Sequence, residues 1–173
     1  MFEHWGEFYL LAGSAAAVLI GLIFVVVTLM QDKPRSTMMA GARLYMGPVV
    51  LQVSFVLVLS AAALTPEIGA RDYAIIAAVV AAWGLYRGVQ SIVGIRKLCW
   101  QEDPPHWSDS WFYGVFPTIL SLGVAEVAWA FWSGEPWAVQ GAAVVNTSIL
   151  LLAIRNEWDL ITWLAPRRES EPS

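Results

Sequence analysis

The residues of this chain that could do chemistry are few, and they stand inside long apolar stretches of the sequence. The polar side chains at these positions are Gln52, Arg87, Gln90, Glu126 and Asn146. An ionisable side chain at the centre of a bilayer costs from about 3 to above 10 kcal/mol, depending on the method of measurement. If the apolar stretches cross a membrane, these five residues are candidates for binding a ligand or for ion permeation.

The sequence does not predict a catalytic or metal-binding grouping. Its two histidines, His4 and His106, fall in opposite peripheral segments, so the serines of the apolar stretches have no histidine at their depth. Cys99 is the single cysteine, which excludes an internal disulfide. The sequence also lacks a glycine-rich phosphate loop and a haem signature. We therefore expect a protein that is not an enzyme and that holds no cofactor and no metal.

The composition is that of a membrane protein. The 173 residues are 58% hydrophobic and 14% charged, against about 45–50% and 25% in soluble domains. These values exclude a disordered chain, a disulfide-stapled mini-protein and an ordinary soluble enzyme. The net charge of −4 argues against a nucleic-acid partner, because binding would require cations to neutralise phosphates.

Five apolar stretches are each about as long as a spanning helix, which needs about 20 residues. They cover residues 8–30, 44–65, 73–95, 112–133 and 136–155. We therefore predict an all-α fold, a polytopic transmembrane helical bundle of five spans. It forms one domain over residues 1–165, with a disordered tail at 166–173. The first stretch lacks the basic segment that precedes a signal peptide's apolar core, so we expect it to be retained.

Residues 157–165 mix acidic, apolar and aromatic positions at roughly helical spacing. Two interpretations remain open. The fifth span continues into the cytoplasm, or a separate short helix lies along the membrane interface.

Lysine and arginine counts predict the orientation, because cytoplasmic loops carry an excess of these residues. Only Arg71 falls on one side of the five spans, and Arg87 lies within a span. The other side receives Lys33, Arg35, Arg43, Arg96, Lys97, Arg155, Arg167 and Arg168. The N-terminus is therefore expected outside and the C-terminus in the cytoplasm, which requires an odd number of spans.

Aromatic residues gather near the predicted span ends, where tryptophan and tyrosine commonly form a belt at the lipid headgroups. We expect such a belt from Trp5, Trp111, Trp132, Trp137, Trp158, Tyr9, Tyr45, Tyr73 and Tyr113.

Small residues at helical spacing predict close contacts between helices. The predicted packing residues are Gly13, Ala17, Gly21, Gly84, Gly88 and Gly123. Because Glu126 follows Gly123 by three residues and precedes Ala130 by four, we expect its side chain to point into a tightly packed interface. Pro117 is expected to kink the fourth helix.

Arg87 and Glu126 are the two ionisable residues inside the predicted spans, and three arrangements remain open. They could form a buried ion pair that fixes helix register. Arg87 could instead reach the inner interface and Glu126 the outer one. The third possibility is a pair that handles protons or ions.

The last predicted span closes with a polar segment that includes Arg155, Asn156, Trp158 and Asp159. Arg155 and Asp159 are four residues apart and can pair along one helix face. We predict that these four residues lie at the cytoplasmic interface. They act there as a stop and topology signal or, alternatively, as a docking or gating site.

The ends of the first and last spans resemble a widespread group of small bacterial membrane proteins. The similar segments are Gly21-Leu22-Ile23-Phe24-Val25 and Arg155-Asn156-x-Trp158-Asp159-Leu160. Glu157 stands where that group has a small residue such as alanine. The resemblance implies a location in the bacterial inner membrane, and the group offers no activity to carry over.

Three functions remain after these exclusions. The first is a non-catalytic accessory, scaffold or regulatory subunit that packs against itself or another membrane protein. The second is a small homo-oligomeric channel or transporter with the polar residues facing a pore. The third is an intramembrane enzyme of unknown type. We predict the first, with the lipid bilayer and a second membrane protein, or copies of this chain, as partners.

Overall fold

The computed structural model describes residues 1–29, 46–98 and 110–164. Within these ranges, five helices are long and apolar enough to cross a membrane. The predicted all-α class with five such helices is confirmed. The predicted tail at 166–173 and Tyr45 lie outside the described residues.

The helices follow the predicted stretches closely. A short 3₁₀ turn, η1 (Glu3–Trp5), leads into α1 (Gly6–Leu29). Next come α3 (Gly47–Leu64) and α4 (Ala70–Leu98). A π-helical turn, η3 (Trp111–Val115), continues into α6 (Phe116–Ser133), and α7 (Ala138–Leu164) follows.

The turn between α6 and α7 depends on a glycine. Gly134 has a φ of +77°, in the left-handed region that glycine adopts without steric cost. The next amide, on Glu135, donates to the Ala130 carbonyl at 2.9 Å and closes the helix end. This tight turn makes α6 and α7 antiparallel neighbours.

The last helix is longer than the span predicted at 136–155. For residues 157–165 we left open a continuation of that span or a separate helix along the interface. The helix continues, because α7 runs without a break from Ala138 to Leu164. Two of the polar residues after position 154, Asn156 and Glu157, are buried in the bundle.

Pro117 alters the helix without ending it. Proline lacks the N–H that would bond to the carbonyl four residues earlier, here that of Tyr113. The Ser91 hydroxyl of α4 donates to this carbonyl at 2.8 Å. The helix widens into η3 just before the proline, as π turns often accommodate such an irregularity. The expected disturbance at Pro117 is thus a π turn tied to α4.

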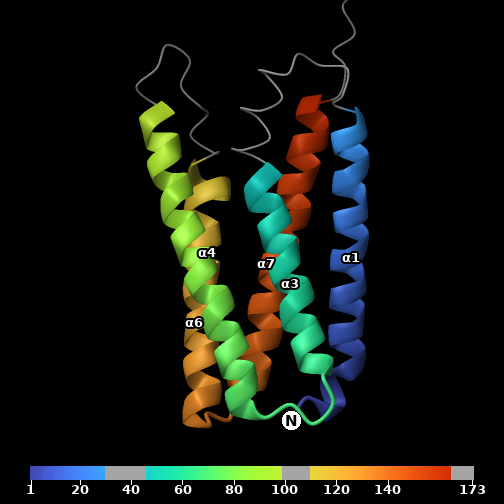
Figure 1. The fold of residues 1–173 in the computed structure, drawn as a ribbon, viewed down its shortest axis with the longest axis vertical. Coiled ribbons are helices and arrows are strands. Elements are labelled where there is room, and N and C mark those ends of the chain that lie inside the picture. The colour runs from blue at the N-terminus through green and yellow to red at the C-terminus, as the bar shows by residue number, and fades with distance from the viewer. Residues whose placement is uncertain (30–45, 99–109, 165–173) are drawn as a thin grey trace, which may run out of the picture.

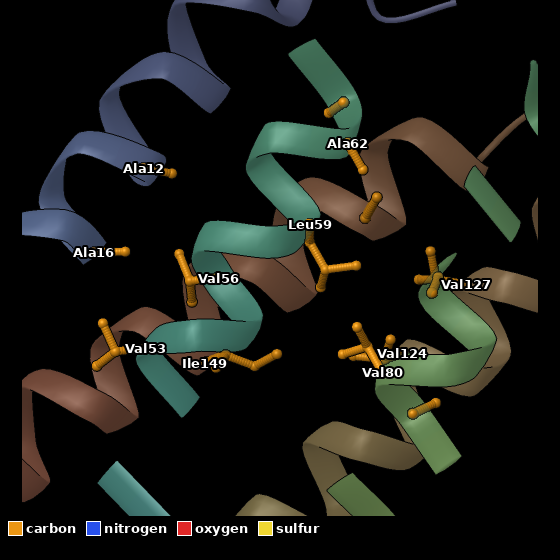
Figure 2. Packing of buried hydrophobic residues seen from close by; sticks show 14 of the residues in the cluster. Ala12, Ala16, Val53, Val56, Leu59, Ala62, Val80, Val124, Val127 and Ile149 are labelled. Carbon is orange, nitrogen blue, oxygen red and sulfur yellow. The ribbon is translucent and has the colours of Figure 1, made fainter. Parts of the chain in front are cut away.

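The bundle consists of two helix pairs with α7 between them (Figure 1). One pair is α1 with α3, and the other is α4 with α6. Figure 2 shows Val53 and Val56 of α3 beside Ala12 and Ala16 of α1. On the other side of α3, Leu59 lies with Ile149 of α7 toward Val80 and Val124. All of these side chains are buried.

Glycines account for the closest helix contacts. A Cβ on Gly84 would collide with Ser121, and one on Gly88 would collide with Thr118, so both glycines let α4 approach α6. A Cβ on Gly13 would lie 3.2 Å from Ser60 Cβ, and one on Gly123 would lie 3.3 Å from Val145. Four of the six predicted packing residues therefore meet a neighbouring helix.

The other two packing residues, Ala17 and Gly21, are exposed on α1. A Cβ on Gly21 would meet nothing within 4 Å. They share a helix face with each other, but α3 and α7 cover a different face of α1, the one that holds Ala12 and Ala16.

The residues of the expected aromatic belt divide into exposed tryptophans and buried tyrosines. Trp111, Trp132, Trp137 and Trp158 are exposed and Trp5 is half-buried. By contrast, Tyr9, Tyr73 and Tyr113 are fully buried. Tyr9 and Tyr73 both pack against Phe2, at ring-centroid distances of 5.1 and 4.8 Å. Their position near helix ends therefore reflects packing under the short N-terminal turn.

Candidate functional site

A cavity of about 210 Å³ lies among α3, α4, α6 and α7. It brings together three of the polar residues singled out in the sequence, Gln52, Arg87 and Gln90. Its remaining walls are mainly apolar or small: Pro48, Leu51, Phe55, Gly84, Gly88, Gly94, Pro117, Leu120 and Ile149, with Ser91, Tyr113 and Ser121. Arg87 and Gln90 are the exposed members of this set, so the cavity opens beside them.

Gln52 supplies the buried polar group of the cavity. Its side chain is 5% exposed, and its Oε1 accepts a hydrogen bond of 3.4 Å from Asn156 Nδ2. Its Nε2 is buried without a hydrogen-bond partner. A buried donor without an acceptor costs about 1–3 kcal/mol, which marks this amide as a group that a ligand or water would satisfy.

Arg87 extends across the mouth of the cavity. Its Nη1 donates to Gln90 Oε1 on the same helix at 3.1 Å. Its Nη2 lies 3.6 Å from the position that a Cβ on Gly47 would occupy at the start of α3. The guanidinium therefore reaches from α4 to α3 and places a positive charge at the opening.

A cluster of hydrogen bonds around Asn156 adjoins the cavity. Asn156 is fully buried, and its Nδ2 also donates to the Phe112 carbonyl at 3.1 Å. The Tyr113 hydroxyl donates to the Asn156 carbonyl at 3.3 Å and to Asp159 Oδ2 at 3.2 Å. These bonds connect α3, η3 and α7, and we call them the Asn156 clasp.

The four residues predicted at the cytoplasmic interface therefore divide into two groups. Asn156 is buried within the bundle, where its amide bonds to backbone and side-chain groups of other helices. Arg155 is half-exposed, with its guanidinium carbon 3.3 Å from the Phe112 ring centroid. It pairs with Asp159 at 4.0 Å, as the i, i+4 spacing predicted. Trp158 is 68% exposed.

Asn146 is separate from the cavity. It is 1% exposed, and its Nδ2 donates to Ser60 Oγ of α3 at 3.0 Å. Ser60 in turn lies against Gly13 of α1. Asn146 therefore connects α7 to the α1–α3 pair, and nothing places it with Arg87.

Glu126 lies on the outer surface of α6, and the expectation that it points into a packed interface within the chain is wrong. It is exposed, and it stands four residues after Leu122 and three before Trp129, which are 54% and 58% exposed. The buried residues of α6 are instead Ser121, Val124, Val127, Ala128, Ala130 and Phe131. The buried Arg87–Glu126 ion pair is therefore not formed within the chain, since both residues are exposed and Arg87 bonds to Gln90.

Glu157 is a site residue that the sequence reasoning missed. It is 2% exposed, and neither carboxylate oxygen has a hydrogen-bond partner. The available signal was a second carboxylate beside Asp159 at the end of a long apolar stretch. Tyr113 and Ser91 were also missed, because a hydroxyl in an apolar stretch gives no sign of its partner.

Comparison of this chain with protein-family models, with curated proteins and with solved structures finds no match. The resemblance to small bacterial membrane proteins therefore stays a prediction.

Proposed function

We propose that this protein is a non-catalytic integral membrane protein that acts as an accessory, scaffold or regulatory subunit by helix packing. In this proposal all five helices cross the bacterial inner membrane, with the N-terminus outside and the C-terminus in the cytoplasm. The length and apolar character of the five helices support insertion. The lysine and arginine counts support the orientation.

The observation that carries the proposal is the exposure of Glu126 on an otherwise apolar face of α6. Ser133, at the end of α6, is seven residues away, or ~10 Å along the helix at 1.5 Å per residue. A glutamate side chain is too short to bring its carboxylate from that depth to water. A carboxylate facing lipid there costs several kcal/mol or more, so a second protein surface that shields it and bonds to it lowers the free energy.

The surface next to Glu126 favours a helix as the partner. A hollow of about 420 Å³ lies between α4 and α6. Its walls contain larger residues, Trp129 and Trp132 among them, and six alanines: Ala74, Ala78, Ala81, Ala82, Ala125 and Ala128. Small side chains allow close approach of helices in membranes. The surface of this chain that the partner would contact therefore combines a shallow apolar hollow with one carboxylate.

The same exposure also favours a second candidate function, a homo-oligomeric channel in which Glu126 lines a pore between copies. The two functions differ in what Glu126→Gln does. If the carboxylate binds a partner, the Glu126→Gln variant loses that partner. If it lines a pore, the variant still assembles but its ion conductance changes.

The experiment compares Glu126→Gln with Glu135→Gln, the same change in the turn that follows α6. Native mass spectrometry of complexes extracted from membranes measures the bound partner or copies, and reconstituted vesicles measure proton and ion flux. The proposal predicts a partner or copy number lowered at least severalfold by Glu126→Gln and unchanged by Glu135→Gln. Unchanged assembly with altered flux would establish the channel instead.

A further inference from the structure

The cavity beside Arg87 has hydrogen-bond donors that its own residues do not satisfy. Gln52 presents a buried amide N–H₂ group without a partner. Its Oε1 already accepts from Asn156, which fixes the direction in which the N–H₂ group points. Arg87 has five N–H donors, and its one recorded hydrogen bond, from Nη1, goes to Gln90.

The charge at the cavity is positive. Among the described residues that line it, none is aspartate or glutamate, and Arg87 is the only ionised side chain. One guanidinium balances one negative charge, and its planar fork matches the two oxygens of a carboxylate. A phosphate monoester carries a charge nearer −2 at pH 7, which a single arginine would leave partly unbalanced.

The walls and size of the cavity define the rest of the ligand. Away from Arg87 and Gln52 the lining is apolar, with Phe55, Leu120 and Ile149 among its members. Its volume of about 210 Å³ is below the ~300–1,000 Å³ of sites that enclose drug-sized molecules. It can hold a polar head and a few methylene groups, and the rest of a longer chain would lie outside it.

From these observations we propose that the cavity among α3, α4, α6 and α7 binds a single-chain amphiphile with a carboxylate head, a long-chain fatty acid. The carboxylate accepts hydrogen bonds from Arg87 and from Gln52 Nε2. The first carbons of the chain lie against Leu51, Phe55 and Leu120. This site is distinct from the α6 face around Glu126, so its test does not depend on the proposed subunit function.

The test is a titration of the purified full-length chain in detergent with palmitate, followed by native mass spectrometry. The comparison ligands are hexadecanol, which lacks the charge, and hexadecyl phosphate, which carries a different anionic head. We expect one palmitate per chain at saturation, with hexadecanol and hexadecyl phosphate binding at least tenfold more weakly. Equal or tighter binding of either comparison ligand would overturn the proposal.

The variants locate the site. Loss of charge-assisted hydrogen bonds in Arg87→Gln is expected to weaken palmitate binding about ten- to hundredfold. The matched control is Arg71→Gln, sixteen residues earlier on α4, where the arginine stacks on Trp132 outside the cavity. It is expected to bind within twofold of the unmodified chain. Equal affinities of the two variants would overturn the proposal.

A second variant keeps the test decisive if Arg87→Gln does not fold. Leu51→Trp retains the arginine but fills the cavity, and thermal unfolding in detergent checks that it folds. We expect it to lose palmitate binding at least tenfold. Retention of full affinity by a folded Leu51→Trp would place the bound palmitate elsewhere and contradict the proposal.

Discussion

At the scale of single residues, Asn156 connects three elements of the bundle, α3, η3 and α7. Its amide bonds to Gln52 on α3 and to the backbone of η3, and its carbonyl accepts from Tyr113. In an apolar interior no water is present to form hydrogen bonds with these polar groups, so they depend on one another as partners. The clasp therefore sets the register of α7 against both helix pairs.

Replacing Asn156 by alanine is the first residue-scale prediction. Interhelical hydrogen bonds in a membrane protein contribute about 0.6 kcal/mol on average and up to ~1.7 kcal/mol. Asn156→Ala removes two of these bonds, to Gln52 and to the Phe112 carbonyl, and should lower the free energy of unfolding by about 1–3 kcal/mol. Asn146→Ala removes one recorded bond, to Ser60, and should cost less. Unfolding in detergent measures both, and an equal or larger loss for Asn146→Ala would contradict the clasp.

Glu157 gives a residue-scale prediction of opposite sign. Its buried carboxylate has no partner, and an unsatisfied buried polar group costs about 1–3 kcal/mol, more if charged. Glu157→Met fills a similar volume without that cost, so it should raise the free energy of unfolding by about 1 kcal/mol or more. The control, Glu7→Met on the exposed side of α1, should show no such gain. A loss of stability in Glu157→Met would mean that the carboxylate has a favourable role.

At the scale of elements, the tightest association is that of α4 with α6. It depends on Gly84 and Gly88, which face Ser121 and Thr118. The hydroxyls of these two residues donate to their own helix backbone, at the Pro117 and Gly114 carbonyls, both at 2.8 Å. Small side chains whose hydroxyls bond to their own helix therefore face the two glycines. This lets the backbones of α4 and α6 approach closely.

The element-scale prediction compares two glycines. Gly88→Ala places a methyl group against the Thr118 side chain and backbone, and such overpacking typically costs about 1–3 kcal/mol. Gly21→Ala adds the same methyl group where nothing lies within 4 Å. It should leave the free energy of unfolding unchanged or slightly higher. Thermal unfolding of the two variants checks this, and equal melting temperatures would contradict the assigned α4–α6 contact.

The helices themselves were predictable from the sequence because long apolar runs bounded by polar residues, proline and glycine leave little choice. Which face of each helix is buried was not predictable. In a chain this apolar, both the buried and the outer sides of a helix are hydrophobic, so periodicity does not separate them. For that reason Gly84 and Gly88 were identified correctly as packing residues, while Ala17 and Gly21, with the same spacing pattern, lie on the outside.

At the scale of the whole molecule, the polar residues identified in the sequence divide among three places. Gln52, Arg87 and Gln90 line one cavity, Asn146 is buried near Ser60, and Glu126 faces outward. These residues could be identified from the sequence because each is a polar residue within a long apolar stretch. Their grouping could not, because it depends on how α7 and the two helix pairs are rotated against one another.

The separation of these polar residues also bears on the proposed function. A pore within one chain would need all five polar residues to converge, but Asn146 and Glu126 lie apart from the cavity that holds the other three. In the proposed function, a second protein surface shields the exposed Glu126 carboxylate of α6. The central claim is therefore that protein, and not lipid, covers the face that contains Leu122, Glu126 and Trp129.

Site-specific photo-crosslinking in intact membranes tests that claim most directly. A photoreactive amino acid is placed at Leu122 or Trp129, which flank Glu126, and at Val18, which is 63% exposed on α1. The account predicts a discrete protein adduct from both α6 positions and none from Val18. If Leu122 and Trp129 yield no more protein adduct than Val18, lipid covers this face and the account is wrong.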